Sequence, residues 1–275
     1  MGSANYIEQL HNVELEILDE IDRICSENDI RYSITAGTLL GAVRHGGFIP
    51  WDDDADIVMP REDYEKFCKI ANKKMNPEFF VDSFYTSKTH FFKFAKVRKK
   101  NTIFQEAYLA NTKKKVNNEI YIDVFPLDNA DSSLELMKRK QRTINLLAGL
   151  LELKFVNLKT GKKYSLMSKC IPVCVLRKAI TAIMKSGPSN SCNYVNYGSQ
   201  YGVEKQTMPK EVYFPSTKIQ FEDRIYRAPA NQIYFLKKLY GEKYMELPPE
   251  EKRRTHVPSD ICFDVAERER KAQNV

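Results

Sequence analysis

The sequence predicts an α+β fold in which a mixed β-sheet is flanked by helices, with a helical insertion and an α/β C-terminal extension. Three observations lead to this prediction. Several short runs alternate apolar and polar residues, as strands with one buried face do. Segments with helical periodicity lie between and around them, and residues 132–186 read as helix throughout. With 275 residues, 43% of them hydrophobic, the chain can bury one substantial core and a smaller accessory layer.

Each element follows from local patterning. Residues 6–27 place apolar side chains such as Leu10, Ile17 and Ile21 at helical spacing, which predicts an N-terminal helix. A second helix is expected over 61–74 after Pro60, and a third over 231–239, stopped by Gly241. The expected strands are 31–35, 54–59, 79–84, 91–98 and 119–125, with a strand pair within 212–226. We divide the chain into a core (1–130), a helical subdomain (131–190) and a C-terminal extension (191–275) that completes the cleft.

Four aspartates crowd one turn: Asp52, Asp53, Asp54 and Asp56. Two carboxylates about 4 Å apart repel by roughly 4 kcal/mol at an effective dielectric near 20, so the cluster favours a bound divalent cation. In a strand over 54–59, Asp54 and Asp56 share one face while the residues between and after them point into a core. Two carboxylates one pleat apart can hold Mg²⁺, with Mn²⁺ as the alternative. The competing interpretation is a solvated acidic turn.

Two further elements favour the metal hypothesis. The extended run that ends at Gly37-Thr38 passes into a short helix, and the backbone N–H groups of such a turn attract phosphate. The Thr38 hydroxyl can add a donor. Downstream, the alternating run 120–125 places Asp123 opposite its apolar residues, as a candidate third metal carboxylate.

These motifs resemble a known family. The order Gly-Thr, Asp-x-Asp and a later single Asp resembles the nucleotidyltransferase superfamily. Within it, TLLGAVRHGGFIPWDDDADIVMP, YIDVFPLD and FEDRIYRAPANQIYFLKKLYGEKYMELPPEEKRRTH closely resemble the LicD family of phosphocholine and related phospho-alditol transferases, to which fukutin-related proteins are also similar. The match spans most of residues 5–256. This chain departs at Ala36 and Ala55, where we expect glycine or a similar small residue and a larger aliphatic residue, and at Val257, where relatives often carry a second histidine after His256.

The resemblance implies a nucleotidyltransferase-like sheet and a reaction. A CDP-linked alcohol phosphate gives its distal phosphoryl group to a sugar hydroxyl of a cell-surface glycan, a teichoic-acid-type precursor or another lipid-linked glycan, and CMP is released. When the family's functional residues are transferred to the matching positions of this chain, Asp54 and Asp56 are the metal-binding pair and Asp123 is the third acidic residue. Mg²⁺ would neutralise the diphosphate oxygens while a carboxylate, Asp123 first and Asp52 second, positions or deprotonates the hydroxyl.

Other residues are candidate substrate contacts, each with a structural alternative. Lys96 and Arg98 share a strand face and, like Arg44, can hold a diphosphate or instead organise the aspartates. Trp51 can stack on a base or wedge under its loop, and His256 is retained as a contact without a catalytic role. Ten aromatic residues of the C-terminal third could face a quaternary ammonium, although most should be core: Tyr194, Tyr197, Tyr201, Tyr213, Phe214, Phe221, Tyr226, Tyr234, Tyr240 and Tyr244.

The net charge of +7 coexists with the acidic cluster, so basic residues gather elsewhere, at 93–100, 113–115 and 138–185. No nucleic-acid-binding module accompanies them, and nucleic acid is not an expected partner. The basic segment 138–185 either packs its leucines on the core or lies on an anionic membrane surface. Its most apolar part, residues 166–184, is interrupted by three basic side chains, which argues against a membrane-spanning helix.

The six cysteines lack zinc-site spacing, and the N-terminus does not read as a signal peptide. Together they predict a cytoplasmic protein, peripheral at the inner face of the membrane if the basic segment binds lipid. Two other functions stay open. One is a glycosyltransferase that uses the acidic triplet to hold a nucleotide-sugar's metal, and the other is a catalytically silent scaffold that binds a glycan.

Overall fold

The structure, a computed structural model, describes residues 3–253 and 257–273. A mixed sheet forms its centre, in the order β1 (Ser33–Ile34), β2 (Asp56–Pro60), β6 (Tyr121–Asn129), β4 (Ala95–Lys99) and β3 (Phe79–Asp82). β2 and β6 run parallel, and the other pairs along this path are antiparallel. The far end of β6 also pairs with β7 (Asn193–Val195), which pairs with β8 (Thr207–Pro209). This mixed α+β architecture is the predicted fold class at the level of sheet and flanking helices.

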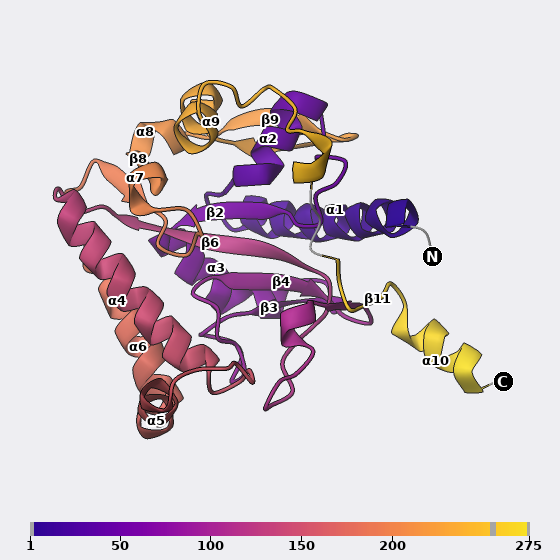
Figure 1. Cartoon of the computed structure of the whole chain (residues 1–275). Helices are drawn as coiled ribbons and strands as arrows, with labels where there is room; N and C mark the ends of the chain where they lie inside the picture. The colour runs from indigo at the N-terminus through magenta and orange to yellow at the C-terminus, as the bar shows by residue number, and fades with distance from the viewer. Residues whose placement is uncertain (1–2, 254–256, 274–275) are drawn as a thin grey trace.

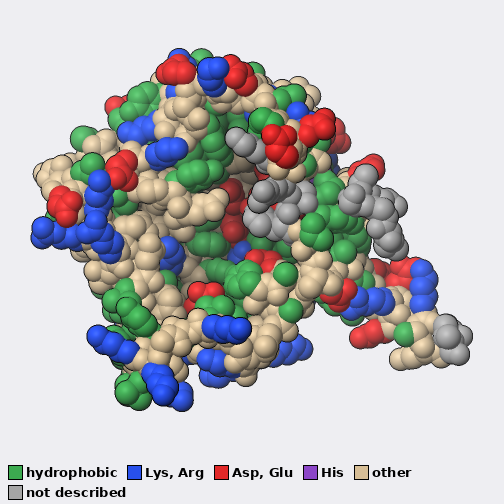
Figure 2. Space-filling view, viewed as in Figure 1, with side chains coloured by type: hydrophobic (Ala, Val, Ile, Leu, Met, Phe, Trp, Pro, Cys, Tyr) green, Lys and Arg blue, Asp and Glu red, His purple; other side chains and the backbone are tan. Residues whose placement is uncertain are grey.

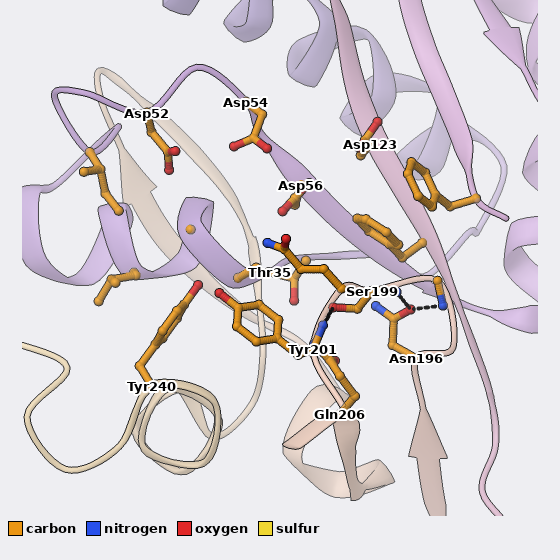
Figure 3. A pocket seen from close by; sticks show the side chains of 18 of the residues that line it. Thr35, Asp52, Asp54, Asp56, Asp123, Asn196, Ser199, Tyr201, Gln206 and Tyr240 are labelled. Atoms are coloured by element: carbon orange, nitrogen blue, oxygen red, sulfur yellow. Dashed lines mark hydrogen bonds between the residues drawn. The ribbon is translucent and has the colours of Figure 1, made fainter. Parts of the chain in front are cut away.

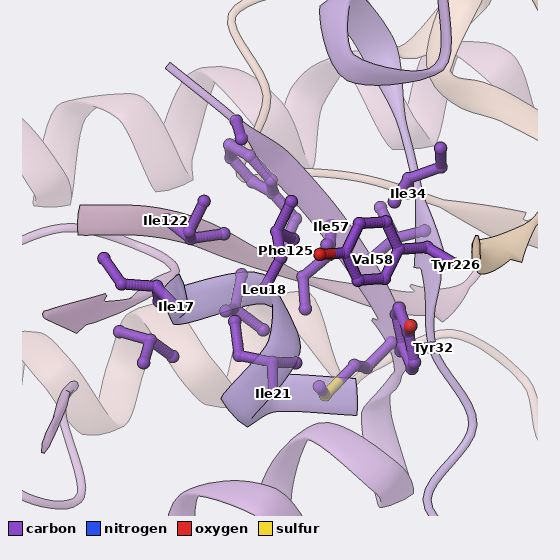
Figure 4. Packing of buried hydrophobic residues seen from close by; sticks show 14 of the residues in the cluster. Ile17, Leu18, Ile21, Tyr32, Ile34, Ile57, Val58, Ile122, Phe125 and Tyr226 are labelled. Carbon is purple, nitrogen blue, oxygen red and sulfur yellow. The ribbon is translucent and has the colours of Figure 1, made fainter. Parts of the chain in front are cut away.

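Helices α1 (Ser3–Glu27) and α3 (Arg61–Lys74) pack on one face of the sheet (Figure 1). The helical stripe of α1, with Ile17, Leu18 and Ile21, lies against Ile57 and Ile122, all of them fully buried (Figure 4). Because residues alternate along a strand, Asp56 and Asp123 point to the opposite face. The apolar residues that α1 covers therefore determine which face carries the acids.

The helical insertion consists of α4 (Leu134–Glu152), α5 (Lys162–Cys170) and α6 (Val173–Met184), seen beside the sheet in Figure 1. Its inward residues, including Ile144, Leu151 and Ile180, join a second hydrophobic cluster with Phe91 and Val195 of the core and extension. The prediction of continuous helix over 132–186 is wrong at 153–161, where an irregular segment separates α4 from α5. Among the described residues no helix is both long and apolar enough to cross a bilayer.

The C-terminal part surrounds the cleft with short elements. The hairpin of β9 (Thr217–Phe221) and β10 (Arg224–Ala228) lies slightly later than predicted, and α9 (Gln232–Tyr240) is capped by Asn231 and ended by Gly241. The last strand, residues 260–262, crosses back to the core and pairs with the strand formed by residues 103–105. The remaining elements are α2 (Ala36–His45), β5 (Ile103–Gln105), η1 (Ala107–Leu109), α7 (Val203–Gln206), α8 (Lys210–Tyr213), η2 (Glu250–Lys252), β11 (Asp260–Cys262) and α10 (Val265–Gln273).

Candidate active site

Strand register brings three charged residues into line. Asp56 of β2 is the register partner of Asp123 of β6, and Asp123 is the partner of Lys96 of β4. Their side chains share the sheet face opposite α1, and Lys96 Nζ lies 2.8 Å from Asp123 Oδ1. All three line one cavity. The predicted proximity of Asp56 and Asp123 thus follows from the pairing of two parallel strands.

The other acids come from the segment that precedes β2. The predicted strand 54–59 is wrong at its start, because β2 begins at Asp56 and residues 52–55 are irregular. In this conformation the carboxylates of Asp52, Asp53 and Asp54 come within 4.8 Å of one another. Gly37 permits this arrangement, since a Cβ at that position would lie 2.7 Å from Asp52 Oδ2.

Helix α2 anchors the start of β2. The Thr38 hydroxyl accepts a 2.7 Å hydrogen bond from the backbone N–H of Asp56. Thr38 is buried and lies in the first turn of α2, because the helix begins at Ala36 and already includes the Gly37-Thr38 turn that was predicted to precede it. Ala36 has φ of 46°, in the left-handed region that favours glycine, which explains why glycine was expected there. Gly37 lines the cavity, whereas Thr38 is not among its lining residues.

Burial and mutual repulsion raise the pKa values of the acids. The pKa of Asp52 rises to about 8, first because of burial and then because of the neighbouring Asp54 and Asp53 charges. The pKa of Asp56 is raised well above its usual range by burial, by Asp54 and by Asp123. For Asp123 burial also raises the pKa, and the Lys96 ammonium opposes that rise. A site with these properties gains stability when a cation enters it.

A sixth carboxylate, Glu14 of α1, lies behind the cluster and was not predicted. It is 1% exposed, its Oε2 has no hydrogen-bond partner, and its pKa is raised by burial and by Asp54. In the sequence, a glutamate at an otherwise apolar helix position was the available signal. Glu14 adds negative potential beneath the acids without lining the cavity.

Two sets of carboxylates could hold a cation. The predicted trio is Asp54, Asp56 and Asp123, whereas the carboxylates already gathered within 4.8 Å are Asp52, Asp53 and Asp54. Asp54 is common to both sets, and its charge is the largest neighbouring influence on Asp56. Figure 3 shows Asp52, Asp54, Asp56 and Asp123 distributed along one side of the cavity. Strand register fixes two members of the trio, Asp56 and Asp123, in the sheet.

The cavity has a volume of about 960 Å³ and is visible as a red-lined hollow in Figure 2. Its wall opposite the acids is the loop 196–202, which the sequence reasoning missed. Asn196 Oδ1 accepts hydrogen bonds from the backbone N–H groups of Gly198 and Ser199, at 2.9 and 3.1 Å. The Ser199 hydroxyl is in turn held by Gln206 Nε2 at 2.8 Å. This polar loop is therefore preorganised, and Figure 3 shows it facing the aspartates.

Aromatic side chains complete the lining. Of the ten aromatics considered from sequence, Tyr201, Tyr240 and Tyr244 line the cavity. The rings of Tyr201 and Tyr240 meet edge to face at 6.0 Å, with their hydroxyl ends toward the acids (Figure 3). A second aromatic wall comes from β5, β6 and the segment before β4. It lies beside Lys96 of β4, whose Nζ is 3.3 Å from the Tyr121 ring centroid. Its other members on the cavity are Phe92, Phe94, Phe104 and Phe125.

The remaining candidates separate into two groups. Arg44 and Trp51 line the cavity; Arg44 donates to the Tyr244 and Glu246 carbonyls, and the Trp51 ring is covered by Arg253 at 4.9 Å. Arg98 is buried, does not line the cavity, and binds Asp82 and the Glu119 carbonyl. His256 lies outside the described residues.

The fold and site define an α+β protein with a carboxylate-lined cavity on one face of a mixed sheet. Residues 29–145 match the family model described as LicD/FKTN/FKRP, nucleotidyltransferase domain. This stretch thus matches the LicD-family domain model, as its motifs predict.

Individual relatives extend the similarity. The lipopolysaccharide cholinephosphotransferase LicD of Haemophilus influenzae is 27% identical over 259 residues, which cover 88% of this chain and 92% of that protein. An uncharacterized protein of Rickettsia typhi is 46% identical over 55 residues, 20% of this chain and 18% of its own length. Another, from Rickettsia prowazekii, is 48% identical over 48 residues, 18% of each.

Proposed function

We propose that this protein is a Mg²⁺-dependent transferase that moves phosphocholine, or a similar phospho-alcohol, from a CDP-linked donor to a sugar hydroxyl of a cell-surface glycan or its lipid-linked precursor. The observation that carries the proposal is the alignment of Asp56, Asp123 and Lys96 across three strands, within the cavity that Asp54 also lines. The similarity to a cholinephosphotransferase over 88% of the chain supports the type of group transferred.

The donor set fits a hard divalent cation. Its atoms are carboxylate oxygens, which Mg²⁺ and Mn²⁺ accept as ligands, and burial leaves their mutual repulsion poorly screened. Asp54, Asp56 and Asp123 would hold the ion, which when bound neutralises charge on the diphosphate oxygens. The pKa values of Asp52 and Asp56, raised first by burial and then by neighbouring like charges, are the observation that favours such a cation.

The protein's own residues account for the rest of the reaction. The acceptor oxygen attacks the distal phosphorus, the bond from that phosphorus to the bridging oxygen breaks, and CMP leaves with the electron pair. Asp123 takes the hydroxyl proton, with Asp52 as the second candidate. Lys96 holds Asp123 Oδ1 and so orients the carboxylate. Arg44 and Lys96, both on the cavity wall, are placed to meet diphosphate charge.

The cavity offers an aromatic site for the choline end of the donor. Tyr201 and Tyr240 present ring edges and faces beside the carboxylates. A quaternary ammonium is attracted both to aromatic faces and to nearby negative charge. The phenylalanine-rich wall is less suited to it, because the Lys96 ammonium already occupies that position.

A donor panel tests the proposal. The purified protein is mixed with Mg²⁺, a set of cell-surface glycans and each of CDP-choline, CDP-ethanolamine, CDP-glycerol and CDP-ribitol, and CMP is measured. We expect CMP from at least one donor, with EDTA, Asp54→Asn or Asp56→Asn reducing the rate at least 1,000-fold, since EDTA removes the metal and each substitution removes the negative charge of a metal ligand.

Asp223→Asn is the matched control, because that side chain is 80% exposed on the β9–β10 hairpin. It should keep the parent rate. Undiminished CMP release by both active-site variants overturns the mechanism. Consumption of a nucleotide-sugar, with no CMP from any CDP-alcohol, supports the glycosyltransferase instead.

A further inference from the structure

One segment of the chain contains no acidic residue. Aspartate and glutamate account for 36 of the 275 residues, yet none occurs between Glu152 and Glu204. The same interval holds eight basic residues: Lys154, Lys159, Lys162, Lys163, Lys169, Arg177, Lys178 and Lys185. Such a one-sided distribution produces a local positive potential that neighbouring acids in the sequence cannot cancel.

Two of these basic side chains have structural roles. Arg177 donates to the carbonyls of Ser87 and Lys88, and Lys185 pairs with Glu65 at 2.7 Å. The other six appear in none of the ion pairs between described residues. Five of them are exposed, and Lys159, Lys162, Lys163 and Lys169 lie on or just before α5.

Apolar side chains share this surface with the lysines. Leu158, Tyr164 and Leu166 are 38%, 47% and 64% exposed. Beside them the end of α4 and the following segment form a shallow groove of about 310 Å³. Its lining is mainly apolar: Leu146, Gly149, Leu150, Leu153, Leu158 and Tyr164, with Asn145, Lys159 and Thr160. Figure 2 shows apolar and basic side chains together at the lower left of the molecule, where Figure 1 places α5.

The helical periodicity of segment 138–185 does not itself produce this surface. Leu150, Leu151 and Phe155 are buried in the second hydrophobic cluster, as the packing interpretation predicts. The exposed Leu158 and Leu166 belong to the irregular segment and to α5 instead, and on α4 itself Leu146, 44% exposed, lines the groove beside them. They remain uncovered because α5 turns only Ser168 fully inward, where its hydroxyl donates to the Leu150 carbonyl at 2.9 Å.

The surface is continuous with the active-site cavity. Asn145 of α4 lines both the cavity and the groove. Its Oδ1 accepts a 2.9 Å hydrogen bond from Lys93, which also lines the cavity. A molecule held at the groove would therefore lie beside one mouth of the cavity.

We propose that residues 158–169 dock on an anionic lipid bilayer, with Leu158, Tyr164 and Leu166 at the acyl boundary and the lysines among the headgroups. Exposed apolar side chains combined with basic ones are the combination that binds such an interface, and the positive charge selects anionic over neutral lipid. Docking in this orientation places the cavity mouth near headgroups that could carry an acceptor. The inference does not rest on the proposed function, because lipid binding is measured without turnover.

The test is sedimentation of the full chain with vesicles of phosphatidylcholine containing 30% phosphatidylglycerol, compared with phosphatidylcholine alone. We expect binding to the anionic vesicles only, weakening as salt is raised. Lys159→Glu with Lys162→Glu and Lys163→Glu should reduce the partition coefficient about 100-fold, since each lysine near an anionic surface contributes a factor of roughly 5. Leu158→Ser with Leu166→Ser should reduce it about 10-fold or more.

Matched controls place the same changes on exposed residues elsewhere. Lys69→Glu, Lys73→Glu and Lys218→Glu give the same net charge, and Ile225→Ser with Ile233→Ser removes apolar side chains that are 64% and 61% exposed. These variants should bind vesicles as the parent does. Absence of binding to anionic vesicles, or equal loss in the control variants, overturns the proposal. So does a dimer that the leucine variants dissociate while no variant changes lipid binding.

Discussion

At the scale of single residues, the cavity presents two aromatic walls that differ in charge. Lys96 lies over Tyr121 with Nζ 3.3 Å from the ring centroid, so a second cation is repelled from that wall. The Tyr201–Tyr240 pair lies beside carboxylates instead, and burial followed by Tyr201 and Asp56 raises the pKa of Tyr240. Tyr240 therefore stays neutral and offers both a ring and a hydroxyl.

Tyr240→Leu should distinguish choline from uncharged alcohols. We expect kcat/KM with CDP-choline to fall about 30-fold, the equivalent of a desolvated cation–π contact of about 2 kcal/mol, and to change little with CDP-glycerol. Tyr240→Phe keeps the ring and should stay within about threefold of the parent enzyme. An equal fall with both donors would show that Tyr240 supports the fold of the cavity and not the ammonium.

A buried charged group away from the cavity controls stability in acid. Asp82 is 3% exposed, with His90 Nδ1 3.3 Å from Oδ1 and Arg98 Nε 3.2 Å from Oδ2. Burial alone would raise the pKa of Asp82, but His90 and Arg98 outweigh it and lower that pKa. The folded protein therefore favours the ionised carboxylate more than the unfolded chain does.

The lowered pKa of Asp82 determines how the stability of the folded protein changes with pH. The stabilisation is fully present above the unfolded pKa of about 3.9 and is lost as pH falls toward the lower folded value. Asp82→Asn should reduce the free energy of unfolding by about 3 kcal/mol at pH 7, because it leaves Arg98 buried without its carboxylate. The difference in free energy of unfolding between Asp82→Asn and the parent protein should shrink below about pH 4. Urea unfolding at several pH values measures it, and a constant difference down to pH 2.5 would contradict the assignment.

At the scale of elements, the sequence predicts the strands and helices better than it predicts their first residues. The α3 helix occupies the predicted residues 61–74, because Pro60 and a clear apolar stripe mark its limits. The beginning of β2 is set differently, by a tertiary hydrogen bond between Thr38 and Asp56 that no local pattern encodes. The loop 196–202 was missed for the same reason, since its role in the cavity depends on long-range placement opposite the acids.

Thr38 links two elements, and its removal should affect both stability and catalysis. Thr38→Val keeps the shape but leaves the buried Asp56 N–H without an acceptor, at a cost of about 1–3 kcal/mol. This hydrogen bond holds the backbone of Asp56 at the start of β2, so its loss should displace the Asp56 carboxylate. We therefore expect activity with CDP-choline to fall at least tenfold. Thr38→Ser retains the hydroxyl and should recover most of the activity. Thermal unfolding and CMP release test this prediction, which fails if Val and Ser behave alike.

At the scale of the whole molecule, Asp56, Asp123 and Lys96 sit on the central sheet, whereas Gln141 and Asn145, which line another part of the cavity, come from the helical insertion. The insertion must therefore hold a fixed position relative to the sheet. The second hydrophobic cluster attaches the insertion to the core through contacts between α4, α6, Phe91 and Val195. Arg177 of α6 adds directional hydrogen bonds, because its guanidinium donates to the carbonyls of Ser87, Lys88 and His90.

Arg177→Met should loosen the insertion without unfolding the sheet. Methionine keeps the apolar contact with Phe84 but removes hydrogen bonds from a charged donor, so we expect the free energy of unfolding to fall by about 2–3 kcal/mol. Amide exchange should accelerate in α4 and α6 more than in β2 and β6, since the insertion opens first. Arg139→Met is the control, because Arg139 is 72% exposed and pairs only along its own helix, an interaction that typically contributes about 0.3–0.5 kcal/mol. Uniform acceleration across the sheet and the insertion would mean that the two unfold as one unit and that Arg177 does not position the cavity wall.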